Sequence, residues 1–295
     1  MSPVATVNLI AAASLLAFAL TTPPALAKSP KSEKIQFASA NPEKTELSGH
    51  LYRPKGDGPF TAIVMLHGCG GMLTPKKGYL KKREKFWANW LVAREHLVLL
   101  ADNFNPRGFR SICKLEKRPV QPYRERPFDA YGALTYLQAR DDVRPDQIVL
   151  MGWSNGAMTA LWTIRAGAQQ RPDGLAHDFR AAIAFYPGCV KLYKSDYVTW
   201  VPTLLQLGGS DDWTRPKPCL KLVKQAVRNG SSITADVHDG AYHGFDHPSS
   251  KVRTVTTRNS VYKSGEKQVH VGSNHAARDA ALRNVAVFLD THLGQ

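Results

Sequence analysis

A serine flanked by glycines stands in the segment Gly152-Trp153-Ser154-Asn155-Gly156. The preceding residues, QIVLM, form an apolar run typical of a buried strand, and the following residues, AMTALW, suit a helix. A sharp turn between a strand and a helix leaves no room for side chains beside the serine, and this requirement explains both glycines. The spacing therefore predicts that Ser154 is a nucleophile. The alternative is a serine that only caps the helix.

A serine hydroxyl needs a base to take its proton, so this hypothesis requires a histidine and an orienting acid elsewhere. Asp211 follows the apolar run VPTLLQL and two glycines, and His243 lies in a later loop. We expect Asp211 to be the acid because it is the first carboxylate after the glycines, whereas Asp212 is expected to cap the next helix. We expect His243 to be the base because His238 still belongs to a strand.

The loop around this histidine also holds residue types that bind metals, namely His238, His243, Asp246 and His247. Gly244 and Pro248 disfavour a helix there, so the four-residue spacing of two histidines does not place both rings on one face. We therefore expect no metal at this loop.

A tetrahedral intermediate also needs hydrogen-bond donors for its oxyanion. The segment HGCGG at 67–71 follows the apolar run AIVML, as expected of a loop that supplies one donor. We expect the backbone amides of Cys69 and Asn155 to be the two donors. His67 precedes the glycines and is expected to fix the loop through hydrogen bonds.

Three side chains near these positions are candidates for substrate binding. Trp153 and Trp213 adjoin the expected catalytic residues and could wall an acyl pocket, although large aromatic residues at strand ends are more often core. Arg107 follows a strand that ends at Asp102 and could pair with a substrate carboxylate. The alternative is an arginine that holds its own loop by binding backbone carbonyls or a nearby acid.

Apolar runs alternate with helical stretches, which indicates an α/β fold with a mostly parallel, doubly wound sheet and helices on both faces. The expected strands are 47–53, 61–66, 97–102, 147–152, 181–186, 203–207 and 232–237. The expected helices are 79–93, 127–140, 155–166, 215–228 and 276–292. Ligands of such sheets bind at the carboxyl ends of the strands. No repeat or long linker divides residues 28–295, so we expect a single domain there.

Residues 1–27 are expected to be a signal peptide. The apolar run at 9–20 is short for a membrane span and is followed by the small-residue pattern Ala25-Leu26-Ala27. No Lys or Arg precedes the run, and the alternative is a hydrophobic helix packed on the domain. We expect cleavage before Lys28, a periplasmic or secreted protein, and no stable membrane insertion after cleavage.

The sequence has 39 Lys and Arg residues against 24 Asp and Glu residues, which gives a formal net charge of +15. A basic surface favours anionic neighbours such as headgroups, acidic polymers or carboxylated substrates. Expected export and the lack of a recognised nucleic-acid module argue against nucleic acid as the partner.

The four cysteines form an even set and allow three pairings in an oxidising compartment. We expect the disulfides Cys69–Cys113 and Cys189–Cys219, because each pair would join loops at the same end of the expected sheet.

Together these segments resemble the dienelactone hydrolase family of α/β-hydrolases over nearly all of residues 28–295. The resemblance rests on HGCGG at 67, ADNFNPRG at 101, GWSNG at 152, GGSDDWTRPKPC at 208, YHGFDHP at 242 and VGSNHAARDAALRNVAVFL near the C-terminus. It implies the α/β-hydrolase fold, in which serine, acid and histidine follow one another in this order. The founding enzymes have a cysteine nucleophile and a glutamate beside the oxyanion loop, where this chain has Ser154 and Gly68. The family's carboxylate-binding arginine is matched by His247.

These features predict an exported serine hydrolase that cleaves small-molecule carboxylic esters without a cofactor, with lactones and thioesters as related substrates. A peptidase or an acyltransferase would use the same residues. A non-catalytic binding protein is the remaining alternative, and the oligomeric state stays open.

Overall fold

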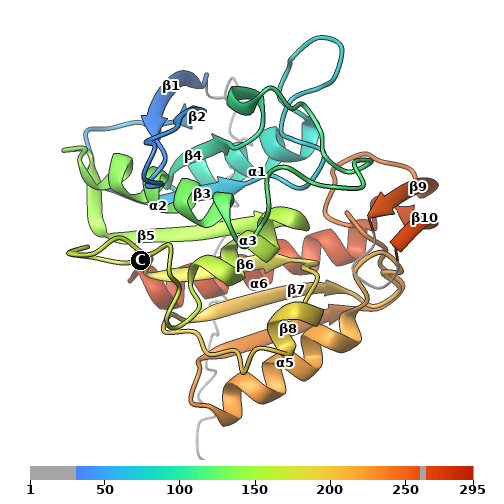
Figure 1. Ribbon diagram of the computed structural model, residues 1–295. Helices are drawn as coiled ribbons and strands as arrows, with labels where there is room; N and C mark the ends of the chain where they lie inside the picture. Colours follow the sequence, from blue (N-terminus) through green and yellow to red (C-terminus); the bar gives the residue numbers. More distant parts are fainter. Residues whose placement is uncertain (1–30, 260–263, 295) are drawn as a thin grey trace, which may run out of the picture.

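An eight-stranded sheet forms the centre of the computed structural model, which describes residues 31–259 and 264–294 (Figure 1). The expected signal peptide therefore lies outside the described residues. The strands of the sheet are β1 (Glu33–Ala38), β2 (Glu46–Tyr52), β3 (Phe60–Leu66), β4 (Leu97–Asp102), β5 (Val143–Trp153), β6 (Ala181–Phe185), β7 (Thr203–Gly208) and β8 (Ile233–His238). Their order across the sheet is β1-β2-β4-β3-β5-β6-β7-β8.

Most neighbouring strands run parallel, as the sequence predicted. The pairs from β4 through β3, β5, β6 and β7 to β8 are parallel, whereas β1 and β2 form an antiparallel edge. The central strands β3 and β4 are mostly apolar and are buried along nearly their whole length, because helices cover both faces of the sheet. Parallel pairing also brings the carboxyl ends of these strands to one edge, where the candidate site lies.

Six α-helices are assigned among the described residues, with a short 3-10 helix η1 (Asn105–Arg107) after β4. They are α1 (Lys82–Val92), α2 (Glu125–Gln138), α3 (Asn155–Thr163), α4 (Val190–Tyr193), α5 (Pro216–Arg228) and α6 (His275–Leu293). Alternate residues of β3 pack on opposite layers. Val64 belongs to the core layer that includes residues of α2, α3 and α5, and Ile63 belongs to the layer that includes residues of α1 and α6. The α/β-hydrolase architecture is thus a three-layer sandwich, with the helices visible on both sides of the sheet in Figure 1.

Besides the short helices η1 and α4, three strands had no expected counterpart in the sequence. β1 is an exposed edge strand with only alternate residues buried, so its apolar signal is weak. β9 (Arg253–Asn259) and β10 (Ser264–Val271) form a separate antiparallel hairpin rich in polar residues. This hairpin lies beside the carboxyl-end edge of the sheet (Figure 1).

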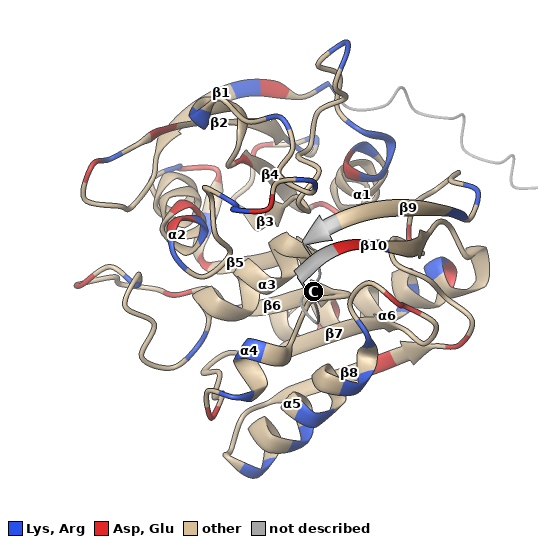
Figure 2. Ribbon diagram, turned by 45° about the vertical axis from the view of Figure 1, so that its right-hand side comes forward, with Lys and Arg blue, Asp and Glu red and all other residues tan. Residues whose placement is uncertain are grey.

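The structure joins Cys69 to Cys113 and Cys189 to Cys219, which are the pairs expected from the sequence. Basic residues are spread over the outer elements, and α5 alone presents Lys217, Lys221, Lys224 and Arg228 to solvent (Figure 2). Among the described residues, none of the helices combines the length and apolar character needed to cross a membrane.

Candidate active site

Ser154 occupies the tight turn between β5 and α3. Its backbone has a φ of 53° and a ψ of −111°, a conformation that costs energy for a residue with a side chain. The flanking glycines are required by close backbone contacts. A Cβ on Gly152 would lie 2.3 Å from the Gly156 carbonyl oxygen, and a Cβ on Gly156 would lie 2.1 Å from the Leu66 carbonyl oxygen. The turn therefore fits the predicted nucleophile position, with the serine oxygen held away from the helix backbone.

A hydrogen-bonded chain runs from this serine to a buried carboxylate. The Ser154 hydroxyl lies 3.0 Å from His243 Nε2, and His243 Nδ1 lies 2.8 Å from Asp211 Oδ2. Asp211 is 3% exposed and His243 is 6% exposed, so solvent competes little for either bond. The structure thus brings together the three residues that the sequence selected, from the ends of three different strands.

Thr214 supports the acid and the base, and sequence reasoning missed it. Its hydroxyl lies 2.9 Å from Asp211 Oδ2 and 3.0 Å from His243 Nδ1. The other oxygen of Asp211 accepts the backbone N–H groups of Trp213 and Thr214, both at 2.8 Å. These bonds fix the carboxylate toward the imidazole. The segment DDWT contained the signal, since an aspartate often binds the backbone two and three residues ahead.

The expectation that Asp212 caps the next helix is wrong. α5 begins after Arg215 with no side-chain cap, whereas Asp212 accepts bonds from the backbone and ring of His270 in β10, at 2.9 and 2.8 Å. Partial burial opposes ionisation of Asp212, but the His270 bonds outweigh it and lower the pKa of the carboxyl. Asp212 therefore fastens the β9–β10 hairpin to the loop that carries Asp211.

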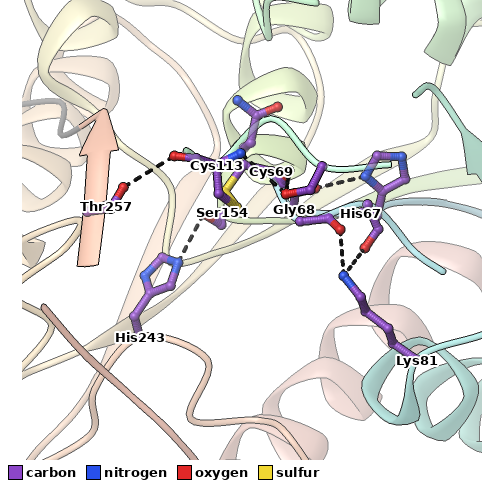
Figure 3. Close-up of a disulfide and its surroundings, with 12 residues drawn as sticks. His67, Gly68, Cys69, Lys81, Cys113, Ser154, His243 and Thr257 are labelled. Carbon is purple, nitrogen blue, oxygen red and sulfur yellow. Dashed lines mark hydrogen bonds between the residues drawn. A yellow bond between two sulfur atoms is a disulfide. The ribbon is translucent and has the colours of Figure 1, made fainter. Parts of the chain in front are cut away.

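The loop at 67–71 lies against the serine turn, as the close-up in Figure 3 shows. Lys81 donates to the carbonyl oxygens of Gly70 and Gly71 at 2.6 and 2.7 Å, and Ile112 N–H donates to the Cys69 carbonyl at 2.8 Å. The disulfide to Cys113 adds a covalent tether to the same loop. The loop is thus held by an ammonium, a backbone bond and a disulfide at consecutive residues.

His67 fixes this loop, as expected, and does not reach the serine as a base. Its Nδ1 donates to the Gly68 carbonyl at 2.8 Å, and its Nε2 accepts the Asn103 backbone N–H at 3.2 Å. Burial lowers the pKa of His67 well below its usual value, so the ring is neutral.

The two amides expected to bind an oxyanion flank the serine. A Cβ on Gly68 would lie only 3.6 Å from Ser154 Cβ, which places the following amide, that of Cys69, beside the nucleophile. Asn155 opens α3, where backbone N–H groups have no intrahelical partner. Within residues 31–259 and 264–294, neither of these N–H groups donates to a backbone carbonyl. Both are therefore available to an oxygen bound at Ser154.

The family to which the chain belongs follows from comparison with known proteins. The family model described as "Dienelactone hydrolase family" matches residues 47–293. The chain belongs to the dienelactone hydrolase family. A curated relative, the protein YtaP of Bacillus subtilis (strain 168), is 27% identical over 136 residues, which cover 40% of this chain and 46% of YtaP. The match thus spans less than half of that relative.

Solved structures share the fold at low sequence identity. Thermogutta terrifontis esterase 2 phosphorylated by paraoxon is 17% identical with a TM-score of 0.62, and the match covers 90% of this chain and 95% of that one. A dienelactone hydrolase-like promiscuous phosphotriesterase from metagenomic libraries is 15% identical with a TM-score of 0.62, covering 89% and 99%. At these identities the likeness shows the fold alone.

A buried carboxylate organises the layer beneath the site in this member of the dienelactone hydrolase family. Asp246 accepts the indole N–H groups of Trp87 and Trp153 at 2.8 and 2.7 Å, and the Tyr186 hydroxyl at 2.6 Å. Trp153 is 1% exposed and stacks on Phe185, so the expectation that it walls a substrate pocket is wrong. It belongs to the core because its ring fills the space beneath the serine turn.

The remaining histidines of the loop are directed to different partners. His238 Nε2 lies 2.6 Å from Gln206 Oε1, and His247 Nδ1 accepts the Ser249 backbone N–H at 3.1 Å. Among the described residues, no group of three or more His, Cys, Asp or Glu side chains is arranged to hold a metal ion.

Ser154 and His243 open into a cavity of about 460 Å³. Trp213 lines it, with its ring centroid 4.7 Å from that of His243, so its role as a wall stays a proposal. Arg107 does not line it. Its guanidinium binds both oxygens of Asp129, at 2.9 and 2.8 Å, and the Asn103 carbonyl at 2.8 Å. The expected contact between Arg107 and substrate is therefore wrong, and the loop-holding alternative describes the structure.

Cations other than Arg107 line the cavity. The charged residues that line the cavity are Lys81, Lys82, Arg83, Glu84 and Arg253. Arg83 pairs with Glu84 and donates to the Tyr186 hydroxyl at 3.2 Å, whereas Arg253 is exposed at the start of β9 and donates to Ser250 Oγ at 2.8 Å. Arg253 was not among the expected site residues because the hairpin that carries it was not expected.

Proposed function

We propose that this chain is an exported serine hydrolase that cleaves small carboxylic esters through an acyl-enzyme on Ser154. The observation that carries the proposal is the continuous chain of hydrogen bonds from Ser154 through His243 to Asp211 at the edge of a cavity. Membership of the dienelactone hydrolase family and the positive φ of Ser154 support the same assignment. Lactones and thioesters present the same acyl carbon and are related substrates.

Acylation would start when Ser154 Oγ attacks the ester carbonyl carbon. His243 Nε2 takes the serine proton as the new C–O bond forms, and Asp211 stabilises the imidazolium through Nδ1. The carbonyl oxygen becomes an oxyanion that accepts hydrogen bonds from the amides of Cys69 and Asn155. Return of the His243 proton to the alkoxide leaving group releases the alcohol. A water molecule then repeats the sequence with His243 as base and frees the acid.

The charge of the cavity supports anionic esters as the preferred substrates. Lys82, Arg83 and Arg253 line it, and Glu84 is bound to Arg83. A substrate carboxylate near these cations would gain charge-assisted hydrogen bonds in a partly enclosed space. Trp213 would contact an apolar part of the substrate.

A fluorophosphonate probe tests the nucleophile directly. The folded wild-type protein should form one adduct, mapped by peptide mass to Ser154, and should hydrolyse p-nitrophenyl acetate. Ser154→Ala should fold normally and lose both reactions. Ser210→Ala is a matched control, because Ser210 lies in another loop at the same end of the sheet, is exposed, and should leave both reactions intact. A folded wild-type protein without an adduct would favour the binding-protein alternative.

Turnover assays separate the remaining alternatives. A peptidase would cleave a peptide anilide faster than the matching ester. An acyltransferase would give mostly the transfer product when an alcohol competes with water for the acyl-enzyme. We expect ester hydrolysis to exceed both.

The disulfides support the export proposal, because such bonds persist in oxidising compartments. N-terminal sequencing of the protein recovered from its native compartment should begin at Lys28. A protein that still begins at Met1 would contradict cleavage.

A further inference from the structure

Arg126, at the start of α2, is a buried cation without a carboxylate partner. The side chain is 0% exposed, and no Asp or Glu within the described ranges lies at ion-pair distance from it. The nearby carboxylate of Asp129 is bound to Arg107 instead. Burial lowers the pKa of Arg126 to about 9, although the charge of Asp129 opposes this shift. Burying a guanidinium without an opposite charge lowers the free energy of unfolding. Its presence here therefore points to a role other than stability.

The acceptors of Arg126 are neutral oxygens from three different segments. Nη1 donates to Asn155 Oδ1 at 2.5 Å, and Nη2 donates to the His67 carbonyl at 2.9 Å. Nη2 and Nε both donate to Asn103 Oδ1, at 2.8 and 3.2 Å. The planar guanidinium therefore bridges the first residue of α3 and the first residue of the loop at 67–71.

These two contacts lie directly behind the two amides assigned to the oxyanion. Asn155 carries one amide. Among the described residues its side-chain Nδ2 has no hydrogen-bond partner, so the bond that Oδ1 accepts from Arg126 is what holds this side chain. His67 lies two residues before Cys69, which carries the other amide. Arg126 thus connects both donor-bearing segments through a rigid fork whose hydrogen bonds have fixed relative directions.

We propose that Arg126 is the positioning residue of the oxyanion hole, setting the separation of the Cys69 and Asn155 amides and placing a fixed positive charge behind them. The inference rests on the proposed ester hydrolysis. Arg126 does not line the cavity, so it would act through the two amides and its field and would not touch the substrate. Positive charge held in a dry interior favours the transition state, where the oxyanion forms, over the neutral ester.

Steady-state kinetics of two variants test the proposal. Removal of one oxyanion donor typically lowers kcat about 100- to 1,000-fold, and loss of its support should cost somewhat less. We expect Arg126→Met to lower kcat roughly 30- to 300-fold with KM changed less than about threefold. Arg126→Lys keeps the positive charge but loses the planar fork. Its kcat should lie between that of the wild type and that of Arg126→Met. The rate at which the fluorophosphonate labels Ser154 should follow the same order: fastest in the wild type, slower in Arg126→Lys and slowest in Arg126→Met.

Arg107→Met is the matched control, since Arg107 is a neighbouring arginine that also binds Asn103 but contacts neither amide-bearing segment. It should lower the melting temperature and leave kcat of the folded protein within about threefold. An unchanged kcat in folded Arg126→Met, even with a lower melting temperature, would overturn the proposal and leave a structural role.

Asn155→Ala keeps the test decisive if Arg126→Met does not fold. This variant removes the Asn155 acceptor of Arg126 but leaves the backbone amide, so kcat should fall while KM stays nearly constant. In the Arg126→Lys background the same substitution should cost little more, because both changes break one link. Fully additive losses would contradict the proposal. Failure of the proposed function is a separate result, seen as wild-type protein that neither hydrolyses esters nor labels at Ser154.

Discussion

The Asp246 carboxylate accepts the Trp153 indole N–H at 2.7 Å, which joins the loop of His243 to the residue that precedes Ser154. The base and the nucleophile come from distant parts of the chain, and this bond fixes one loop relative to the other. Trp87 and Tyr186 donate to the same carboxylate. A fully buried acceptor with three donors is therefore part of what keeps His243 within reach of Ser154.

Asp246→Asn should weaken both the fold and the reaction. An asparagine would point an N–H donor at one of the existing donors, and the buried mismatch should lower the free energy of unfolding by about 1–3 kcal/mol. We expect kcat to fall as well, because the His243 loop loses its anchor. Urea unfolding and ester turnover measure the two effects. Asp239→Asn is the control, since Asp239 is exposed on the same loop and should change neither.

His243→Ala and His247→Ala test the choice of base. His243 contacts Ser154 and Asp211, so its removal should lower kcat about 10,000-fold or more. His247 lines the cavity without contacting either residue in the described structure and should alter kcat far less. A larger loss in His247→Ala than in His243→Ala would make the assignment wrong.

Arg253→Ala tests the preference for anionic esters. Arg253 lines the cavity and has little role in the core, so its loss should raise KM about 5- to 10-fold for an ester that carries a carboxylate. An uncharged ester of equal size should keep its KM. Arg107→Ala should instead affect both substrates alike, because Arg107 is bound to Asp129. Equal losses on the two esters in Arg253→Ala would argue against a charged substrate.

His96 should make the fold sensitive to mild acid. It is buried beside Thr61, with Nδ1 2.5 Å from the hydroxyl, and burial lowers the pKa of His96 to about 4. Between pH 6.5 and pH 4 the unfolded chain binds this proton and the folded chain does not. Above pH 6.5 the protonation of His96 does not lower the free energy of unfolding. As the pH falls from 6.5 toward 4, the free energy of unfolding decreases, by about 3 kcal/mol at most.

His96→Gln should flatten this dependence, measured as the free energy of unfolding in urea at pH 7 and at pH 4.5. His177→Gln, at an exposed position, should leave the slope as in the wild type. An unchanged slope in His96→Gln would show that other groups set the acid sensitivity.

The sequence predicted those elements whose pattern is local. The runs that became β3, β4, β6 and β7 are mostly apolar and buried on both faces, and the spacing around Ser154 is dictated by close backbone contacts that only glycine allows. Asp211 and His243 could then be selected because each lies in a loop that follows an expected strand, later in the chain than Ser154. The structure places these three residues together because parallel strands end at one edge.

Contacts between distant segments could not be predicted in the same way. Trp153 and Arg107 are adjacent to expected site residues in sequence, but their side chains point to Asp246 and Asp129, which only the folded chain brings near. Asp212 binds a hairpin whose polar sequence resembles a loop. Arg126 lies in a helix with no motif around it. Its proposed role depends on contacts with Asn155 and His67, which only the folded chain brings near.

The bond between Cys69 and Cys113 puts a covalent tether in the loop that carries one of the proposed oxyanion donors. Thiols stay reduced in the cytosol, so a newly made chain there would lack this tether even with Ser154, His243 and Asp211 in place. Proposed export would then also be the maturation step. Before export the loop would be held by Lys81 and the Ile112 backbone bond, and its covalent restraint would be added only where oxidation can close the disulfide.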